Sequence, residues 1–221
     1  IHASKDTAVI AKGKHLVYSI AHCNVCHNNQ NTDSLLEKGE DVPLTGGFEF
    51  DLPVGKIYTR NITPDKETGI GKYTDGEIAR VLRNGVRPDG TAAFDFMPFH
   101  NLSDEDLTAI ISYLRSQKPV RNEVAAHKLN MLGNVVNAFM VKPVGPSEKI
   151  ERVVKPDSTA SYGRYLVTNV ANCSGCHTTR DLTGGFTGAF LAGGELEEKG
   201  VTFRPPNITP HPESRIYGWT Q

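Results

Sequence analysis

The sequence predicts an all-α protein made of two tandem domains, of which the second is incomplete. The pentapeptide Cys-x-x-Cys-His occurs twice, at residues 23–27 and 173–177, and residues around one copy recur around the other. Such self-similarity indicates an internal duplication. Apolar residues at helical spacing follow the first motif, whereas the equivalent positions of the second copy would fall beyond Gln221.

The repeated pentapeptide is the attachment signature of c-type haem. Its two thiols form thioether bonds to the porphyrin edge, and its histidine becomes the proximal iron ligand. A single zinc ion shared by both pairs is disfavoured, because structural zinc pairs are separated by roughly 12–20 residues. A thioredoxin-like redox pair would need a βαβ context, which the sequence lacks. The residues expected to hold two haems are Cys23, Cys26 and His27, and Cys173, Cys176 and His177.

Four matched pairs of segments define the repeat. One pair lies ten residues upstream of the motifs, and the other three follow them. The pairs are 13–17 with 163–167, 44–48 with 182–186, 61–64 with 207–210, and Tyr73-Thr74 with Trp219-Thr220.

Two helices are expected in the rest of the first copy. Thr74 followed by Glu77 forms a capping box ahead of a helix over 77–84, which Gly85 closes. Ser103 caps a second helix, which ends before Pro119. The apolar stripe of this second helix is Leu107, Ile110, Ile111 and Leu114.

These signals divide the chain into a first domain over 1–119, a linker over 120–156 and a second domain over 157–221. The linker contains an amphipathic helix, which we interpret as a packing strut between the domains. Its apolar residues are Leu129, Leu132, Val136, Phe139 and Met140.

Composition excludes several classes of function. The 221 residues carry a formal net charge of −1 and no basic block, which argues against nucleic-acid binding. No apolar run approaches the ~20 residues needed to cross a bilayer. The chain begins at Ile1 without Met, so a secretory signal, a membrane anchor or a truncation is expected to account for the missing start. Since c-type haem is attached outside energy-transducing membranes, the expected location is periplasmic or extracytoplasmic.

Met97 is the expected distal ligand of the first haem. Its soft thioether suits ferrous iron, and histidine–methionine ligation raises the reduction potential. It precedes Pro98 in a loop between the two helices, although a methionine there also suits an ordinary core gap. His100 is the nearest rival, and a loop histidine is more often a hydrogen-bonding neighbour. His22 precedes Cys23 on the proximal side.

The distal ligand of the second haem stays open. His211, Met131 and Met140 are candidates within the chain. The alternative that we favour is a methionine beyond residue 221.

The repeated Asn-Ile-Thr-Pro segments are expected to line the haem edges. A buried propionate needs a cation or hydrogen-bond donors, and Asn61 with Arg60 and Asn207 with Arg204 supply both. Turn chemistry alone explains the asparagines equally well. Tyr58 and Phe203 are expected to pack on the porphyrin faces.

Taken together, these motifs resemble those of multi-domain class I cytochromes c. The closest resemblance is to the c-type cytochrome subunits of membrane-bound quinohaemoprotein alcohol and gluconate dehydrogenases. It rests on the tandem motifs, residues 61–74, the turn at 81–90, the Met97-Pro98 loop and the helix at 102–116. The resemblance implies all-α cytochrome c domains with terminal helices crossing beside each haem. Those subunits often carry three haem domains and a membrane-attachment segment, whereas this chain shows two motifs.

Two functions follow from these expectations. The first is transfer of single electrons from a dehydrogenase or quinol-oxidising complex to a downstream acceptor, with no catalytic residue of its own. The second is catalysis at an open second haem, as in dihaem peroxidases or sulfur-compound dehydrogenases. The near-neutral charge provides no strong field to steer a particular partner.

Overall fold

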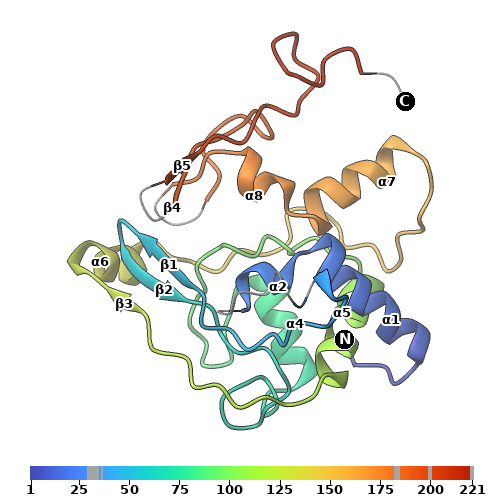
Figure 1. The fold of residues 1–221 in the computed structure, drawn as a ribbon, viewed down its shortest axis with the longest axis vertical. Coiled ribbons are helices and arrows are strands. Elements are labelled where there is room, and N and C mark those ends of the chain that lie inside the picture. The colour runs from blue at the N-terminus through green and yellow to red at the C-terminus, as the bar shows by residue number, and fades with distance from the viewer. Residues whose placement is uncertain (29–34, 36, 182–184, 199–200, 220–221) are drawn as a thin grey trace.

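A computed structural model describes residues 1–28, 35, 37–181, 185–198 and 201–219. Elements of the first half of the chain lie together in one part of the molecule, and those of the second half lie against them (Figure 1). The order of helices begins with α1 (Thr7–His15), the π-helix η1 (Leu16–Ile20) and α2 (Cys23–Cys26). It continues with α4 (Asp75–Asn84), α5 (Asp104–Ser116), α6 (Met131–Phe139), α7 (Ala160–Tyr165), η2 (Leu166–Val170) and α8 (Cys173–His177).

Helices α1 and α5 cross in close contact at Gly13. A Cβ atom built on Gly13 would lie 1.9 Å from the backbone oxygen of Ala109 and 2.8 Å from the Cβ of Tyr113. Only a residue without a side chain permits this approach of the two backbones. The predicted crossing of an N-terminal helix with a later helix is therefore present in the first half of the chain.

The predicted helix caps are confirmed. Thr74 accepts a hydrogen bond from the Glu77 N–H, and the Glu77 carboxylate accepts one from the Thr74 N–H at 2.7 Å. Gly85 ends α4 in the left-handed conformation at φ +60°. Ser103 caps α5 by accepting from the Asp106 N–H at 3.1 Å. Local sequence therefore fixes both helices that flank the Met97 loop.

The all-α prediction is confirmed only in part, because short strands accompany the helices. Strands β1 (Glu49–Leu52), β2 (Gly55–Tyr58) and β3 (Lys128–Leu129) form an antiparallel sheet in the order β1-β2-β3. Strands β4 (Leu196–Glu198) and β5 (Val201–Phe203) form a second hairpin. Each hairpin follows one Cys-x-x-Cys-His motif, so the strands belong to the duplication.

Helix α6 packs on the first sheet, not between the two halves of the chain as predicted. Val136 is buried there with Val54, Ile57 and Phe94. The other face of α6 is exposed, with Met131 at 87% and Phe139 at 76%. The amphipathic pattern therefore identified the helix correctly and its packing partner wrongly, because an apolar stripe does not specify which surface covers it.

Replacing the buried Val136 by alanine is expected to lower the free energy of unfolding by roughly 2 kcal/mol, because the substitution leaves a cavity between α6 and the first sheet. Val135 is 48% exposed on the same helix. Val135→Ala is the matched control and is expected to change stability by less than about 0.5 kcal/mol. Urea unfolding of both variants measures the difference, and equal effects would contradict the packing of α6.

The second half joins the first through Tyr165 at the end of α7. Its hydroxyl donates to the Asp106 carboxylate at 2.5 Å and accepts from the Ser103 N–H at 3.0 Å. Asp106 also forms an ion pair with Lys12 at 2.6 Å. Tyr165 and Val170 belong to the same buried cluster as the first-half helices. A satisfied polar network inside an apolar contact fixes the relative position of the two halves.

Candidate haem sites

The two motifs are presented by the same local structure. A five-residue π-helix, η1 or η2, precedes each motif, and a residue in the left-handed conformation then reverses the chain. These residues are His22 at φ +51° and Asn172 at φ +50°, and His and Asn are side chains that tolerate this conformation. Short helices α2 and α8 then carry the cysteines. The duplication detected in the sequence is thus repeated in backbone geometry.

Each motif histidine is oriented by a backbone carbonyl. His27 Nδ1 lies 2.7 Å from the Arg60 oxygen, and His177 Nδ1 lies 2.7 Å from the Pro206 oxygen. A carbonyl only accepts, so Nδ1 carries the proton and Nε2 keeps its lone pair for a metal. Burial lowers the pKa of His27 and so favours its neutral form, although the hydrogen bond to the Arg60 oxygen acts in the opposite direction. The donor set fits a c-type haem.

The hydrogen bonds correct one part of the predicted repeat. Gly46 donates to the His27 oxygen at 2.9 Å, and Gly193 donates to the His177 oxygen at 2.9 Å. A Cβ on either glycine would meet the segment that orients the histidine. Residues 191–194 are therefore the structural equivalent of 44–47, whereas the sequence match favoured 182–186, of which 182–184 lie outside the described residues. Thr220, in the last matched pair, also lies outside them.

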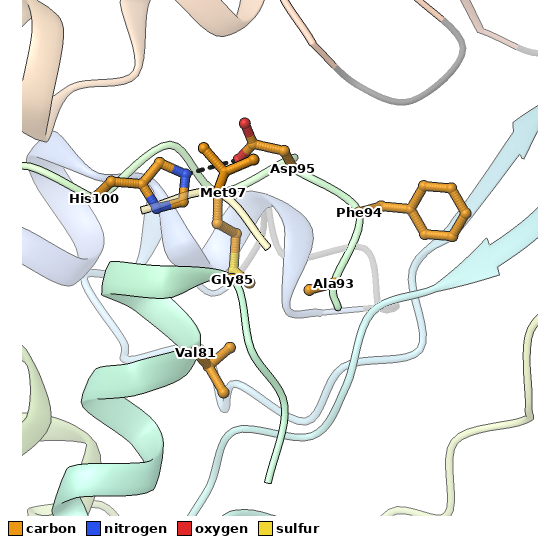
Figure 2. Close-up of a pocket in the computed structure, with 8 residues that line it drawn as sticks. Val81, Gly85, Ala93, Phe94, Asp95, Met97 and His100 are labelled. Atoms are coloured by element: carbon orange, nitrogen blue, oxygen red, sulfur yellow. Dashed lines mark hydrogen bonds and ion pairs between the residues drawn. The ribbon is translucent and has the colours of Figure 1, made fainter. Parts of the chain in front are cut away.

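Met97 lies in the irregular loop between α4 and α5 and packs at the edge of the core cluster that Cys23 also borders. Figure 2 shows its thioether directed toward Gly85 at the end of α4. His100 is held elsewhere, because Nε2 lies 2.9 Å from the Asp95 carboxylate and Nδ1 lies 3.1 Å from the Arg83 oxygen. Both nitrogens of the rival ligand are engaged, which favours Met97. Ligation by Met97 stays a prediction.

The alternatives for the second iron gain no support inside the described chain. Met131 and Met140 are 87% and 56% exposed on α6. His211 accepts a hydrogen bond from the Glu213 N–H at 3.3 Å in its own turn. Among the residues that the structure describes, no hydrogen bond joins any of these three side chains to the second motif.

The Asn-Ile-Thr-Pro segments are organised by turn chemistry in both copies. Asn61 is 2% exposed, and its oxygen accepts from the N–H and hydroxyl of Thr63. Its amide hydrogens are donated to Thr68 and Val120. Asn207 accepts from Thr209 in the same way. The hydrogen-bonding capacity of Asn61 is fully used, so contact with a propionate would require an exchange of partners.

The other predicted haem contacts are placed differently in the two copies. Tyr58 donates to the Glu49 carboxylate at 2.7 Å, whereas Phe203 is 51% exposed on β5. Arg60 donates to the Ala125 oxygen at 3.2 Å, and Arg204 pairs with Glu195 at the surface at 3.0 Å. Their roles toward a haem stay predictions.

Sequence reasoning missed a cationic cluster beside the first site. Arg87 and Arg60 both lie close enough to His127 to disfavour its protonation. Arg87 is half buried and donates to the Ala92 oxygen at 2.6 Å, and its burial lowers the pKa of the guanidinium. The arginine-rich turn contributes to the family resemblance, yet only the fold brings it to Arg60. Two cations at the segment that orients His27 suit an anionic group.

His127 makes the stability of the protein depend on pH. Burial, together with Arg60 and Arg87, lowers its pKa to about 4, and its Nδ1 accepts from the Tyr58 N–H at 3.1 Å. An unfolded histidine titrates near ~6.5, so the unfolded chain binds this proton first. The contribution of neutral His127 is complete above that value and is lost as the pH falls toward about 4.

We expect His127→Gln to flatten the fall in stability between about pH 6.5 and pH 4. Urea unfolding midpoints over this range measure the slope. Val135→Ala, which replaces a half-exposed side chain without a titratable group, is the control and is expected to retain the wild-type slope. A slope unchanged in His127→Gln would contradict the assignment.

The described residues offer neither a shared metal site nor a spanning helix. In ranges 1–28, 35, 37–181, 185–198 and 201–219, no three His, Cys, Asp or Glu side chains gather as metal ligands. The two cysteine pairs therefore do not converge there on one zinc ion. Among the helices of the same residues, none combines the length and apolarity that crossing a bilayer requires.

The repeated motif, its oriented histidine and the surrounding helices are the features expected of a c-type cytochrome, and similar curated proteins are cytochrome subunits. A fructose dehydrogenase cytochrome subunit from Gluconobacter japonicus is 33% identical over 99% of this chain and 44% of its own. The cytochrome c subunit of a quinone alcohol dehydrogenase from Gluconobacter oxydans is 29% identical over 98% of this chain and 45% of its own length. The cytochrome c subunit of a gluconate 2-dehydrogenase from Pantoea cypripedii is 31% identical over 80% of this chain and 40% of its own length.

The chain is thus a relative of dehydrogenase cytochrome c subunits, and its resemblance to those of alcohol and gluconate dehydrogenases is confirmed. It spans less than half the length of each of these three relatives. No family model matches the chain.

Proposed function

We propose that this chain carries single electrons through two covalently attached c-type haems, as part of an electron-transfer subunit that serves a dehydrogenase. The supporting observation is the identical orientation of His27 and His177 at 2.7 Å from a backbone carbonyl. Two sites built alike suit two centres of one kind. We further propose the predicted domains, 1–119, 120–156 and 157–221, and an extracytoplasmic location.

Cys23, Cys26 and His27 would hold the first haem with Met97 on its distal side, and Cys173, Cys176 and His177 would hold the second. A bound haem supplies an iron that changes its charge by one electron. The backbone carbonyls of Arg60 and Pro206 fix the orientation of each proximal imidazole, so that little rearrangement would accompany the charge change.

The haem content of the chain tests the number of sites. Matured in a cell that attaches c-type haem, the wild-type chain is expected to gain the mass of two haems. Cys173→Ala/Cys176→Ala is expected to gain one, with Cys23→Ala/Cys26→Ala as the reciprocal variant. A single haem in the wild-type chain would contradict the proposal.

Catalysis at an open second haem is the alternative function, and one observation in the second half of the chain supports it. The apolar side chains after the second motif are exposed, with Phe190 at 46% and Val201 at 54%. Titration of the reduced protein with carbon monoxide separates the two functions. No binding supports two six-coordinate carriers, whereas tight binding at one haem with peroxide turnover would favour the enzyme.

A further inference from the structure

Arg180 reaches from the second half of the chain into the Met97 loop of the first. It follows the second motif by three residues, and its Nη1 donates a hydrogen bond of 2.7 Å to the backbone oxygen of Asp95. Asp95 precedes Met97 by two residues in the sequence. The contact therefore joins the segment after His177 directly to the loop with the candidate distal ligand.

The guanidinium of Arg180 is held on more than one side. Its central carbon lies 4.3 Å from the ring centroid of Phe186, and the backbones of the same two residues form an isolated β-bridge. Burial lowers the pKa of Arg180, and the charge of Asp95 counteracts this effect. An arginine stacked on an aromatic ring is preorganised and loses little freedom when it donates. Arg180 is thus a rigid anchor.

The hydrogen bonds between the backbone groups of the Met97 loop are local. The Phe96 N–H donates to Phe94 at 2.9 Å, and the Phe99 N–H donates to Met97 at 2.7 Å. The loop is also tied to the first half by two buried side chains, Phe94 and Phe99, which pack in its hydrophobic clusters. Asp95 adds a local bond from its carboxylate, 2.9 Å from His100, and its carbonyl, which accepts from Arg180, ties the loop to the second half.

We propose that Arg180 is a positioning residue, by which the second half of the chain holds Met97 over the first haem. The inference rests on the proposed function, since it takes Met97 as an iron ligand. A thioether is a weak ligand, so its binding depends on the loop that presents it. The first centre consequently keeps its ligand and its potential only while the segment after the second motif is docked.

The test uses the full chain with both haems and compares Arg180→Ala, Arg180→Lys and wild type. The ferric red absorption band of methionine-ligated haem, the midpoint potentials and the rate of carbon monoxide binding are measured. In Arg180→Ala we expect a weaker red band and a lower potential at one haem. Carbon monoxide is expected to bind faster by at least about tenfold, because the substitution removes one charge-assisted hydrogen bond to the Met97 loop. Arg180→Lys, which keeps the charge and loses the stacked fork, is expected to lie between.

Arg164→Ala is the matched control. Arg164 belongs to the same half of the chain and is exposed, and its side chain forms a surface pair with Glu148 at 3.4 Å. All three measurements are therefore expected to remain at wild-type values. Wild-type values in Arg180→Ala would overturn the positioning role. If Arg180→Ala fails to mature, Arg180→Lys decides, and wild-type values in that variant would overturn the role equally.

The failure of the proposed ligand is distinguishable from the failure of this inference. Met97→Ala must abolish the red band of one haem for the proposed function to hold. A band that survives Met97→Ala refutes the ligand, and the positioning role with it. A band that is lost in Met97→Ala and unchanged in Arg180→Ala refutes the positioning role alone.

Discussion

Gly13→Ala is expected to destabilise the protein by roughly 3 kcal/mol or more, since an added methyl group forces two packed helices apart. The new Cβ would lie 1.9 Å from the Ala109 oxygen, which belongs to rigid helical backbone. Neither helix can relieve the overlap by a side-chain rotation. Separation of α1 from α5 would also loosen the cluster that Met97 and Cys23 border.

Gly163 provides the matched control for this prediction. It is the repeat equivalent of Gly13, and a Cβ on Gly163 meets no atom within 4 Å. Gly163→Ala is therefore expected to stabilise α7 by about 0.5–1 kcal/mol, the helix propensity difference between the two residues. Thermal or urea unfolding of both variants, followed by circular dichroism, measures the contrast. Equal effects of the two substitutions would contradict the close crossing of α1 with α5.

Met97→Ala is expected to remove the distal ligand of the first haem and leave its covalent attachment intact. Alanine has no donor atom, and the nearest described rival, His100, is engaged by Asp95 and Arg83. The ferric red band of one haem should disappear, and its potential should fall because methionine ligation raises it. Carbon monoxide should bind one more reduced haem per chain than in the wild type. Absorption spectroscopy and potentiometry of the full chain measure these changes.

Met131→Ala is the control for the loss of a methionine. Met131 is 87% exposed on α6, so its truncation is expected to leave the spectra, the potentials and carbon monoxide binding unchanged. If Met131→Ala reproduced the spectral change, the distal ligand would have been assigned to the wrong residue. Retention of the band in Met97→Ala would place the ligand elsewhere in the chain.

The helices around the first site were predictable because their signals are local. Thr74, Glu77 and Gly85 determine both ends of α4 by hydrogen bonds within one turn. The β1-β2 and β4-β5 hairpins were missed because strands of three or four residues are too short to show a clear alternation of apolar and polar residues. The expected all-α fold also gave no reason to look for strands. The repeat was found from matched residues, and its register near the second motif required the hydrogen bonds of Gly193.

The sequence by itself determined the two Cys-x-x-Cys-His motifs, with the histidines proposed as proximal ligands, and the duplication. Each motif lies in adjacent residues, and the duplication is visible as matched segments, so neither depends on knowing tertiary contacts. Only the tertiary structure brought Arg60, Arg87 and His127 together, placed α6 on the first sheet and joined Arg180 to the Met97 loop. The physical reason is that these contacts link segments far apart in the chain. Their partners are chosen by packing and desolvation of the whole fold, which no local pattern encodes.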